Sequence, residues 1–428
     1  MSVGAVQSST WRLGSASVVL AFALDPLGNI PNVVVLVVIA IAAAQALTMR
    51  RTSADPTNIA LLALSALVAV IGTLEILNPN VPSLTVGLLG FRKSIAFVLG
   101  VVIGLGWLGS RMKGLRLVWW CMFVSASISL AVHLYFPMIA AAIPRSADKY
   151  TSLIGGIERM QGLFAGPFHV SMLGVFLVLS AMAPATVIRS GYLRVAAVLV
   201  GLGCVYYSQV RTGLVALGVG ALVMVLVTGS VKQWVSRLFA FVGLALLAML
   251  YIDPITQYLR QFTALRLLLD GGLDDSRFSQ RYKSWSDGWE MIERSPLWGH
   301  GSGSAGDTLG PYFAGGYHLT SHNTFLKYAV EGGVLQGVIF IALCVGLAMA
   351  VRPSRDVTRF GLAAGLTMLV FGLVGAATEA LPVSFGLAVV VGLCAMRKAV
   401  TESTAGAQTG RPLAPAPALV PPNKSKGG

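Results

Sequence analysis

The sequence predicts an all-α, polytopic membrane helix bundle of about twelve transmembrane helices, with a large extracytoplasmic loop that carries amphipathic helices. Of the 428 residues, 55% are hydrophobic and only 11% are charged, less than half of the roughly 25% that soluble domains use. Charge-free runs such as 59–73 and 366–378 are typical of segments that face lipid. Length and composition together exclude a cytosolic enzyme.

Twelve segments fit the rule that a membrane-spanning helix needs about 20 mostly apolar residues. They are 14–25, 30–48, 58–77, 94–110, 114–134, 168–187, 193–209, 210–228, 235–252, 324–350, 357–376 and 379–397. The first segment is short and is interrupted by Asp25 and Pro26, so eleven spans is the alternative count. Because apolar sequence continues into a second span, we expect an uncleaved anchor rather than a cleavable signal.

The formal charge of +14 is explained by membrane topology. A strongly basic chain usually suggests nucleic-acid binding, but here Lys and Arg are scattered between apolar segments. With the N-terminus inside, the cytoplasmic side carries 18 basic and three acidic residues, a net of +15, and the outer side has a net of −1. Cytoplasmic connections are enriched in Lys and Arg, so we expect both termini in the cytoplasm and no nucleic-acid partner.

This topology divides the chain into four parts. They are the bundle of spans one to nine (1–252), a large extracytoplasmic loop (253–322), spans ten to twelve (323–400) and a Pro/Ala-rich tail (401–428). The tail has no periodicity and is predicted to be a disordered cytoplasmic extension. A loop of 70 residues is long for a connection, and such loops are usually functional or disordered.

The large loop has a helical pattern. Apolar residues recur at helical spacing between Phe278 and Ile292, which predicts an amphipathic helix over 277–294 that ends at Ser295 and Pro296. A shorter amphipathic helix is predicted over 256–269. Both are expected at the outer membrane interface, against the bundle.

Metal and nucleotide sites are disfavoured. Gly301, Gly303 and Gly306 spell GxGxxG, but no strand–helix unit surrounds them, so we expect a close turn that returns the chain to the membrane. A zinc site at His300, His318 and His322 is the alternative, although acidic partners nearby are limited to Asp307. The four cysteines lie in separate apolar spans, as core residues do. We therefore expect no metal and no cofactor.

Arginines at the outer ends of the spans are the first candidate functional residues. They are Arg92, Arg159, Arg211, Arg277 and Arg281. A charge near hydrocarbon is unfavourable and is often functional, and the guanidinium fork matches phosphate oxygens. The alternative is that these side chains extend to the interface or pair with the acidic residues of the loop. Arg211, at the junction of two apolar spans, favours function most clearly.

A second set of candidates opens the tenth span. Ser321, His322 and Asn323 stand at its outer end, and histidine exchanges protons near neutral pH. Glu331 follows nine residues later, either as a packing carboxylate or as a partner of His322 or of an arginine. The Asp274–Asp275 pair suggests metal-dependent sugar transfer less well than a solvated turn.

Residues 321–335, Ser-His-Asn-Thr-Phe-Leu-Lys-Tyr-Ala-Val-Glu-Gly-Gly-Val-Leu, resemble the His-Asn … Glu-x-Gly signature of the O-antigen ligase and polymerase superfamily. Further matches follow in the same order along the chain. They are 78–79 with 87–92, Arg159–Pro167, Arg211-Thr-Gly-Leu, and 281–285 leading to Pro296-Leu-Trp-Gly-His-Gly. One departure is Gln336, where the family usually has a second glycine, which bears on local helix packing.

The resemblance implies a glycosyltransferase of the bacterial cytoplasmic (inner) membrane that uses a polyprenyl-diphosphate-linked glycan, such as one on undecaprenyl diphosphate. The acceptor is another glycan or a lipid-linked glycan, and no metal or cofactor is needed. His322 would take the acceptor proton, and Arg211 and Arg281 would hold the diphosphate. Arg277, Arg159, Arg92, Asn323 and Glu331 would bind substrate.

Two other classes remain as alternatives. A flippase or exporter of lipid-linked oligosaccharide would place charged residues along a central path, whereas here ionisable groups cluster at the outer ends of the spans. A non-catalytic scaffold would leave the patterned loop unexplained. The sequence does not distinguish a ligase from a polymerase.

Overall fold

The computed structural model describes residues 3–49, 55–107, 110–143, 153–154, 157–182, 187–227, 276–306, 309–313, 316–351 and 356–396. Several predicted features lie outside these residues: the span 235–252, the helix 256–269, the Asp274–Asp275 pair, Asp307 and the tail 401–428. The limits of the predicted loop at 253 and of the tail therefore stay predictions.

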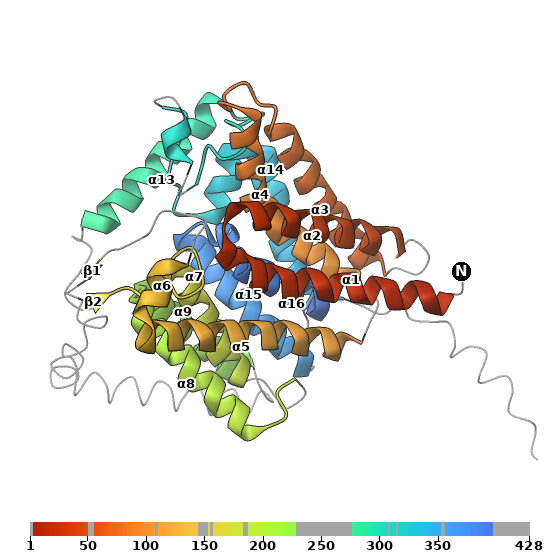
Figure 1. The fold of residues 1–428 in the computed structure, drawn as a ribbon. Coiled ribbons are helices and arrows are strands. Elements are labelled where there is room, and N and C mark those ends of the chain that lie inside the picture. The colour runs from red at the N-terminus through yellow and green to blue at the C-terminus, as the bar shows by residue number, and fades with distance from the viewer. Residues whose placement is uncertain are drawn as a thin grey trace, which may run out of the picture.

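Within the described residues, the named elements are helices apart from one pair of short strands (Figure 1). The longer helices are α1 (Val3–Leu24), α2 (Asn29–Met49), α3 (Pro56–Glu75), α4 (Leu84–Leu105), α5 (Arg111–Tyr135), α7 (Pro167–Met182), α8 (Gly191–Ser208), α9 (Arg211–Val227), α13 (Ser276–Arg294), α14 (Thr324–Ala350), α15 (Asp356–Val374) and α16 (Val383–Ala395). Shorter elements are η1 (Asp25–Leu27), α6 (Pro137–Ala142), η2 (Gly310–Tyr312) and η3 (Ala377–Glu379). Strands β1 (Leu153–Ile154) and β2 (Ile157–Glu158) pair antiparallel, Leu153 opposite Glu158.

Five of the described helices, α3, α4, α5, α8 and α14, are long and apolar enough to cross a membrane. Shorter apolar helices are found in α2, α7, α9, α15 and α16. Large apolar side chains are exposed on the outside of the bundle, for example Val37 and Ile41 on α2 and Val345 on α14. Water does not favour such a surface and lipid does, so the fold is an all-α membrane helix bundle.

The predicted helix limits agree closely with the structure at α14, which spans 324–350, and at α13, which begins one residue before the predicted 277. Two helices begin well before their predicted starts: α1 begins at Val3 although the apolar run predicts 14, and α4 begins at Leu84 although the apolar run predicts 94. Ser83 caps this helix because its Oγ accepts a hydrogen bond from Val86 N at 3.3 Å. The first turns of α4 therefore contain Arg92 and Lys93, which a rule based on apolar runs leaves out.

Small residues let the helices of the core approach closely. A Cβ added to Gly104 of α4 would lie 2.5 Å from the Val389 carbonyl oxygen of α16, and one added to Gly174 of α7 would lie 2.6 Å from the Gly201 oxygen of α8. Helices inside a membrane associate by this kind of packing, because burial of apolar surface from water drives them little there. At these two glycines α4 lies close against α16, and α7 lies close against α8.

The amphipathic helix α13 lies at the edge of the bundle beside α14 (Figure 1). Met291 and Ile292 on its inner face pack with Leu326 and Val330 of α14 in a small apolar cluster. On its other face, Tyr282 is 68% exposed. The structure therefore confirms the predicted amphipathic helix and places it against the start of the tenth predicted span.

Candidate functional site

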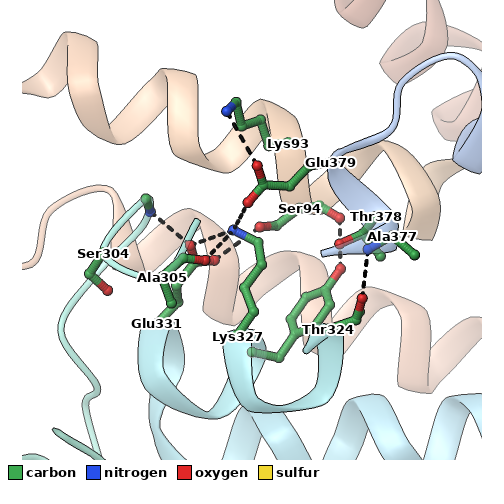
Figure 2. A network of polar contacts seen from close by, with 12 residues as sticks. Lys93, Ser94, Ser304, Ala305, Thr324, Lys327, Glu331, Ala377, Thr378 and Glu379 are labelled. Carbon is green, nitrogen blue, oxygen red and sulfur yellow. Dashed lines mark hydrogen bonds and ion pairs between the residues drawn. The ribbon is translucent and has the colours of Figure 1, made fainter. Parts of the chain in front are cut away.

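A buried ion-pair network centres on Lys327 in the first turns of α14 (Figure 2). Its Nζ lies 2.6 Å from Glu331 Oε1 and 3.0 Å from Glu379 Oε1, and it donates to the Ala305 carbonyl at 3.0 Å. Glu379 Oε2 in turn lies 3.3 Å from Lys93 Nζ. Side chains 327 and 331 are completely buried. Two lysines and two carboxylates thus form a chain of alternating charge across α4, α14 and η3.

Glu331 fastens the loop that follows α13 to the bundle. Its Oε1 accepts a hydrogen bond from Gly303 N, and its Oε2 accepts one from Ser94 Oγ of α4, both at 3.0 Å. Gly301 and Gly303 have φ values of +87° and +86°, which glycine adopts readily. The expected close turn at these glycines is confirmed, and Glu331 supplies the charge that holds it.

A break in α14 receives the same loop. Gly332 and Gly333 have non-helical dihedral angles, with φ of Gly333 at +78°. The freed backbone groups bond to the loop instead: Val334 N donates to Pro296 O at 2.8 Å, and Gly301 N donates to Glu331 O at 2.9 Å. A backbone group inside a membrane protein must find such a partner. The two predicted motifs, Glu-Gly-Gly and Pro-Leu-Trp-Gly-His-Gly, are therefore halves of one junction.

Gln336, the residue that departs from the family pattern, is buried just below this break. A Cβ added to Gly332 would lie 2.5 Å from Gln336 Oε1 and 2.1 Å from Glu75 Oε1. The amide therefore fills space beside Gly332 and the end of α3, and the helix packs without a second glycine there.

Asn323 fixes the start of α14. Its Oδ1 accepts hydrogen bonds from Phe325 N at 2.9 Å and Leu326 N at 3.0 Å, which makes it the helix cap. Its amide also donates to Leu373 O at 3.2 Å, at the end of α15. Thr324 Oγ1 donates to Gly375 O at 3.0 Å. These bonds tie the position of the preceding residue, His322, to α15.

His322 has a left-handed backbone with φ of +45°, and its side chain is half-buried. The pKa of its imidazole lies below the ordinary 6.5, first because burial disfavours the charged ring and second because Arg281 adds a like charge. The structure therefore brings Arg281 of α13 close enough to His322 to act on it electrostatically. The neutral ring is the form that a general base needs.

Arg211 and Arg159 share a second location. Arg211 is the first residue of α9, after a tight turn in which Gln209 is left-handed. Arg159 Nε donates to Ser208 O at 3.1 Å, and Met160 N donates to Tyr207 O at 2.9 Å. The segment after β2 is therefore fastened to the end of α8, and Arg159 lies beside the turn that leads to Arg211.

Contacts between helix ends show that these locations belong to one end of the bundle. A Cβ added to Gly213 of α9 would lie 2.1 Å from Ser171 Oγ of α7. Phe168 of α7 packs edge-on against Phe371 of α15, with ring centroids 4.9 Å apart. The end of α15 bonds to the start of α14. The starts of α7, α9 and α14 and the end of α15 are therefore neighbours, with Arg211 and His322 among them.

The remaining predictions concern Arg92, Arg277 and a metal site. Arg92 is 8% exposed on α4, next to Lys93. Arg277 lies in the first turn of α13, and the structure does not describe its side chain. Among the residues described, no group of three or more His, Cys, Asp or Glu side chains could hold a metal ion, and the ring of His300 contacts the Met291 carbonyl at 2.7 Å.

Sequence reasoning missed Lys93, Lys327 and Glu379. One signal could have found them, because ionisable residues inside apolar helical segments are unfavourable and are often functional. Lys327 lies within the span predicted over 324–350, and Glu379 opens the last predicted span. What the sequence does not reveal is their pairing.

Comparison with known proteins shows a similarity to one family over part of the chain. A family model described as O-antigen ligase matches residues 196–341, which contain Arg211, α13, the glycine turn and the first half of α14. A comparison with curated proteins found no match. The match covers the segments that build the junction and the His322 site, and it agrees with the motifs seen in the sequence. Over this region the chain is similar to the O-antigen ligase family, in agreement with the resemblance seen in the sequence.

Proposed function

We propose that this protein is an inverting glycosyltransferase that transfers or polymerises a polyprenyl-diphosphate-linked glycan at the outer face of the bacterial cytoplasmic membrane. The single observation that carries the proposal is the position of His322 just before the capped start of α14, where the charge of Arg281 on α13 helps to lower the pKa of its imidazole, within the region that matches the family. The acceptor is a hydroxyl of a glycan or of a lipid-linked glycan. We include in the proposal the twelve-span topology, with both termini in the cytoplasm and the loop outside.

The reaction is a single displacement at the anomeric carbon of the donor. His322 takes the proton from the acceptor hydroxyl while the oxygen of that hydroxyl forms the new glycosidic bond. The bond from that carbon to the diphosphate oxygen breaks, and polyprenyl diphosphate leaves with both electrons. Arg211 and Arg281 stabilise the negative charge that develops on the leaving group. The activated diphosphate supplies the driving force, so the proposal needs no metal.

The remaining candidates have supporting roles in this proposal. Arg159 and Arg92 contribute positive charge around the diphosphate, and Arg277 extends the same face of α13 by one helical turn. Asn323 and Glu331 were predicted to bind substrate, and that role stays a prediction. Their contacts support a positioning role, because Asn323 caps α14 and Glu331 holds the glycine turn.

Purified protein in nanodiscs, given a lipid-linked glycan, an acceptor and EDTA, tests the proposal. We expect a glycosidic product and free polyprenyl diphosphate without added metal. A liposome assay distinguishes the main alternative: donor that crosses the bilayer without bond formation would identify a flippase. Deletion in the host separates the two kinds of transferase, because a polymerase loss leaves single repeats and a ligase loss leaves long chains on the lipid carrier.

Arg211→Ala is expected to lower kcat by about 10²–10³-fold, the usual effect of removing one donor to a developing oxyanion. Arg211→Lys should recover only part of the rate, because a point charge replaces a two-pronged donor. The matched control is Arg194→Ala. Arg194 lies in the first turn of α8, at the opposite end of that helix from the turn to α9, and its Nε donates to Ile188 O. Equal losses in the 194 and 211 variants would contradict the assignment.

The pH profile of kcat/KM should follow His322. Because the folded pKa lies below 6.5, the neutral base persists as pH falls through 6.5, and activity is lost only at lower pH. Arg281→Gln removes a like charge, so it should raise this pKa and move the acid limb to higher pH, besides lowering the rate. An acid limb centred above 6.5, or one that Arg281→Gln leaves in place, would contradict the role of His322.

A further inference from the structure

An apolar groove of about 310 Å³ lies between α13 and α14. Trp285, Trp289 and Ile292 form one wall, and residues of α14 from Phe325 to Ile341 form the other. The volume is at the lower end of the range for ligand pockets, and the lining is almost wholly apolar. Such a site suits a hydrocarbon and does not suit a sugar.

The groove begins beside His322, the proposed general base. Asn323, beside His322, lines one end of it, and the other wall continues along α14 to Ile341 in the membrane-spanning part of that helix. On α13, Arg281 precedes Trp285 by four residues and Trp289 by eight, so the three share one face of the helix. On this face of α13, Arg281 is therefore followed by the two tryptophans that form the aromatic wall of the groove.

The groove is also open at the surface of the bundle. Trp289 is 62% exposed and Val338 is 56% exposed, although both line it. A lipid chain can therefore enter from the side while the charged end stays at the outer surface. A ligand with an anionic head and a long apolar tail matches this order of charge and apolar surface.

We propose that this groove binds the first isoprene units of the donor's polyprenyl tail, next to the diphosphate. This inference rests on the proposed function. An acceptor does not carry its reacting hydroxyl on a hydrocarbon, whereas the donor tail is joined directly to the diphosphate that Arg281 binds. Broad aromatic faces such as those of the two tryptophans offer large apolar contact to a branched, unsaturated chain.

Val338→Trp tests the groove by filling it, and Leu335→Trp is the matched control. Both residues are exposed on α14, at 56% and 58%, but only Val338 lines the groove. We expect Val338→Trp to raise the KM for a long-tailed donor about tenfold and to leave kcat unchanged. In the same variant, the KM for a donor truncated to one isoprene unit should stay near the wild-type value. In Leu335→Trp, the KM values for the long-tailed donor and for the truncated donor should both stay near the wild-type values.

A binding readout that needs no catalysis completes the test. Farnesyl diphosphate with a diazirine on its tail should label peptides of α13 and α14 in the wild type, and at least fivefold less in Val338→Trp. A phospholipid with the same diazirine should label them weakly. Equal labelling by the phospholipid, or unchanged KM values in Val338→Trp, would overturn the groove while the transferase stands. Labelling by a wild type that transfers no glycan would instead overturn the transferase.

Discussion

His322→Asn is expected to lower the rate of glycan transfer by about 10²–10⁴-fold, the usual contribution of a general base. Asparagine is the replacement of choice because residue 322 has φ of +45°, and Asn adopts left-handed backbone more easily than most residues. The fold and the donor affinity should therefore survive. Initial rates, the Tm in detergent and the donor dissociation constant measure the three effects separately.

A second variant keeps this test specific to the base. His322→Gly also tolerates the left-handed backbone and leaves a space where imidazole can bind. Added imidazole should restore part of the rate in His322→Gly and none in Arg211→Ala. A His322→Asn protein that retains more than about a tenth of the wild-type rate would remove His322 from the proposed mechanism.

Lys327→Met is expected to lower the free energy of unfolding by about 3–5 kcal/mol, the usual result of breaking a buried ion pair on one side. The variant would leave Glu331 without its 2.6 Å partner and Glu379 without its 3.0 Å partner. Denaturation in detergent measures the loss. Lys93→Met is the matched control, and it should be milder because Lys93 is 14% exposed and its ion pair with Glu379 is longer, at 3.3 Å.

The double variant Lys327→Met, Glu331→Gln separates the energy of the Lys327–Glu331 ion pair from the packing of the two side chains. Residues in direct contact are not additive, so the double variant should be clearly more stable than the sum of the two single losses predicts. Additive losses would mean that the ion pair itself contributes little. The double variant should still transfer glycan slowly, because the glycine turn loses its charged acceptor at Glu331 Oε1.

The sequence predicted the helices well because their signals are local. Apolar runs located α14 to the residue, and the spacing of aromatic residues located α13 within one residue. Motif order also pointed to the family, and the match over residues 196–341 confirms it. The start of α4 was predicted ten residues late, because Arg92 and Lys93 interrupt the apolar run and their partners lie far away in the chain.

By itself, then, the sequence determined a membrane helix bundle, an amphipathic loop helix and a resemblance to a family, which the match over residues 196–341 supports. Only the tertiary structure decided how the motifs combine: Glu331 holds the glycine turn, the break at Gly333 receives the loop after α13, and Lys93 pairs with Glu379 across 286 residues. The physical reason is that periodicity and composition act between neighbours in the chain. The partner of a buried charge or of a freed backbone group is set by packing, which no local pattern records.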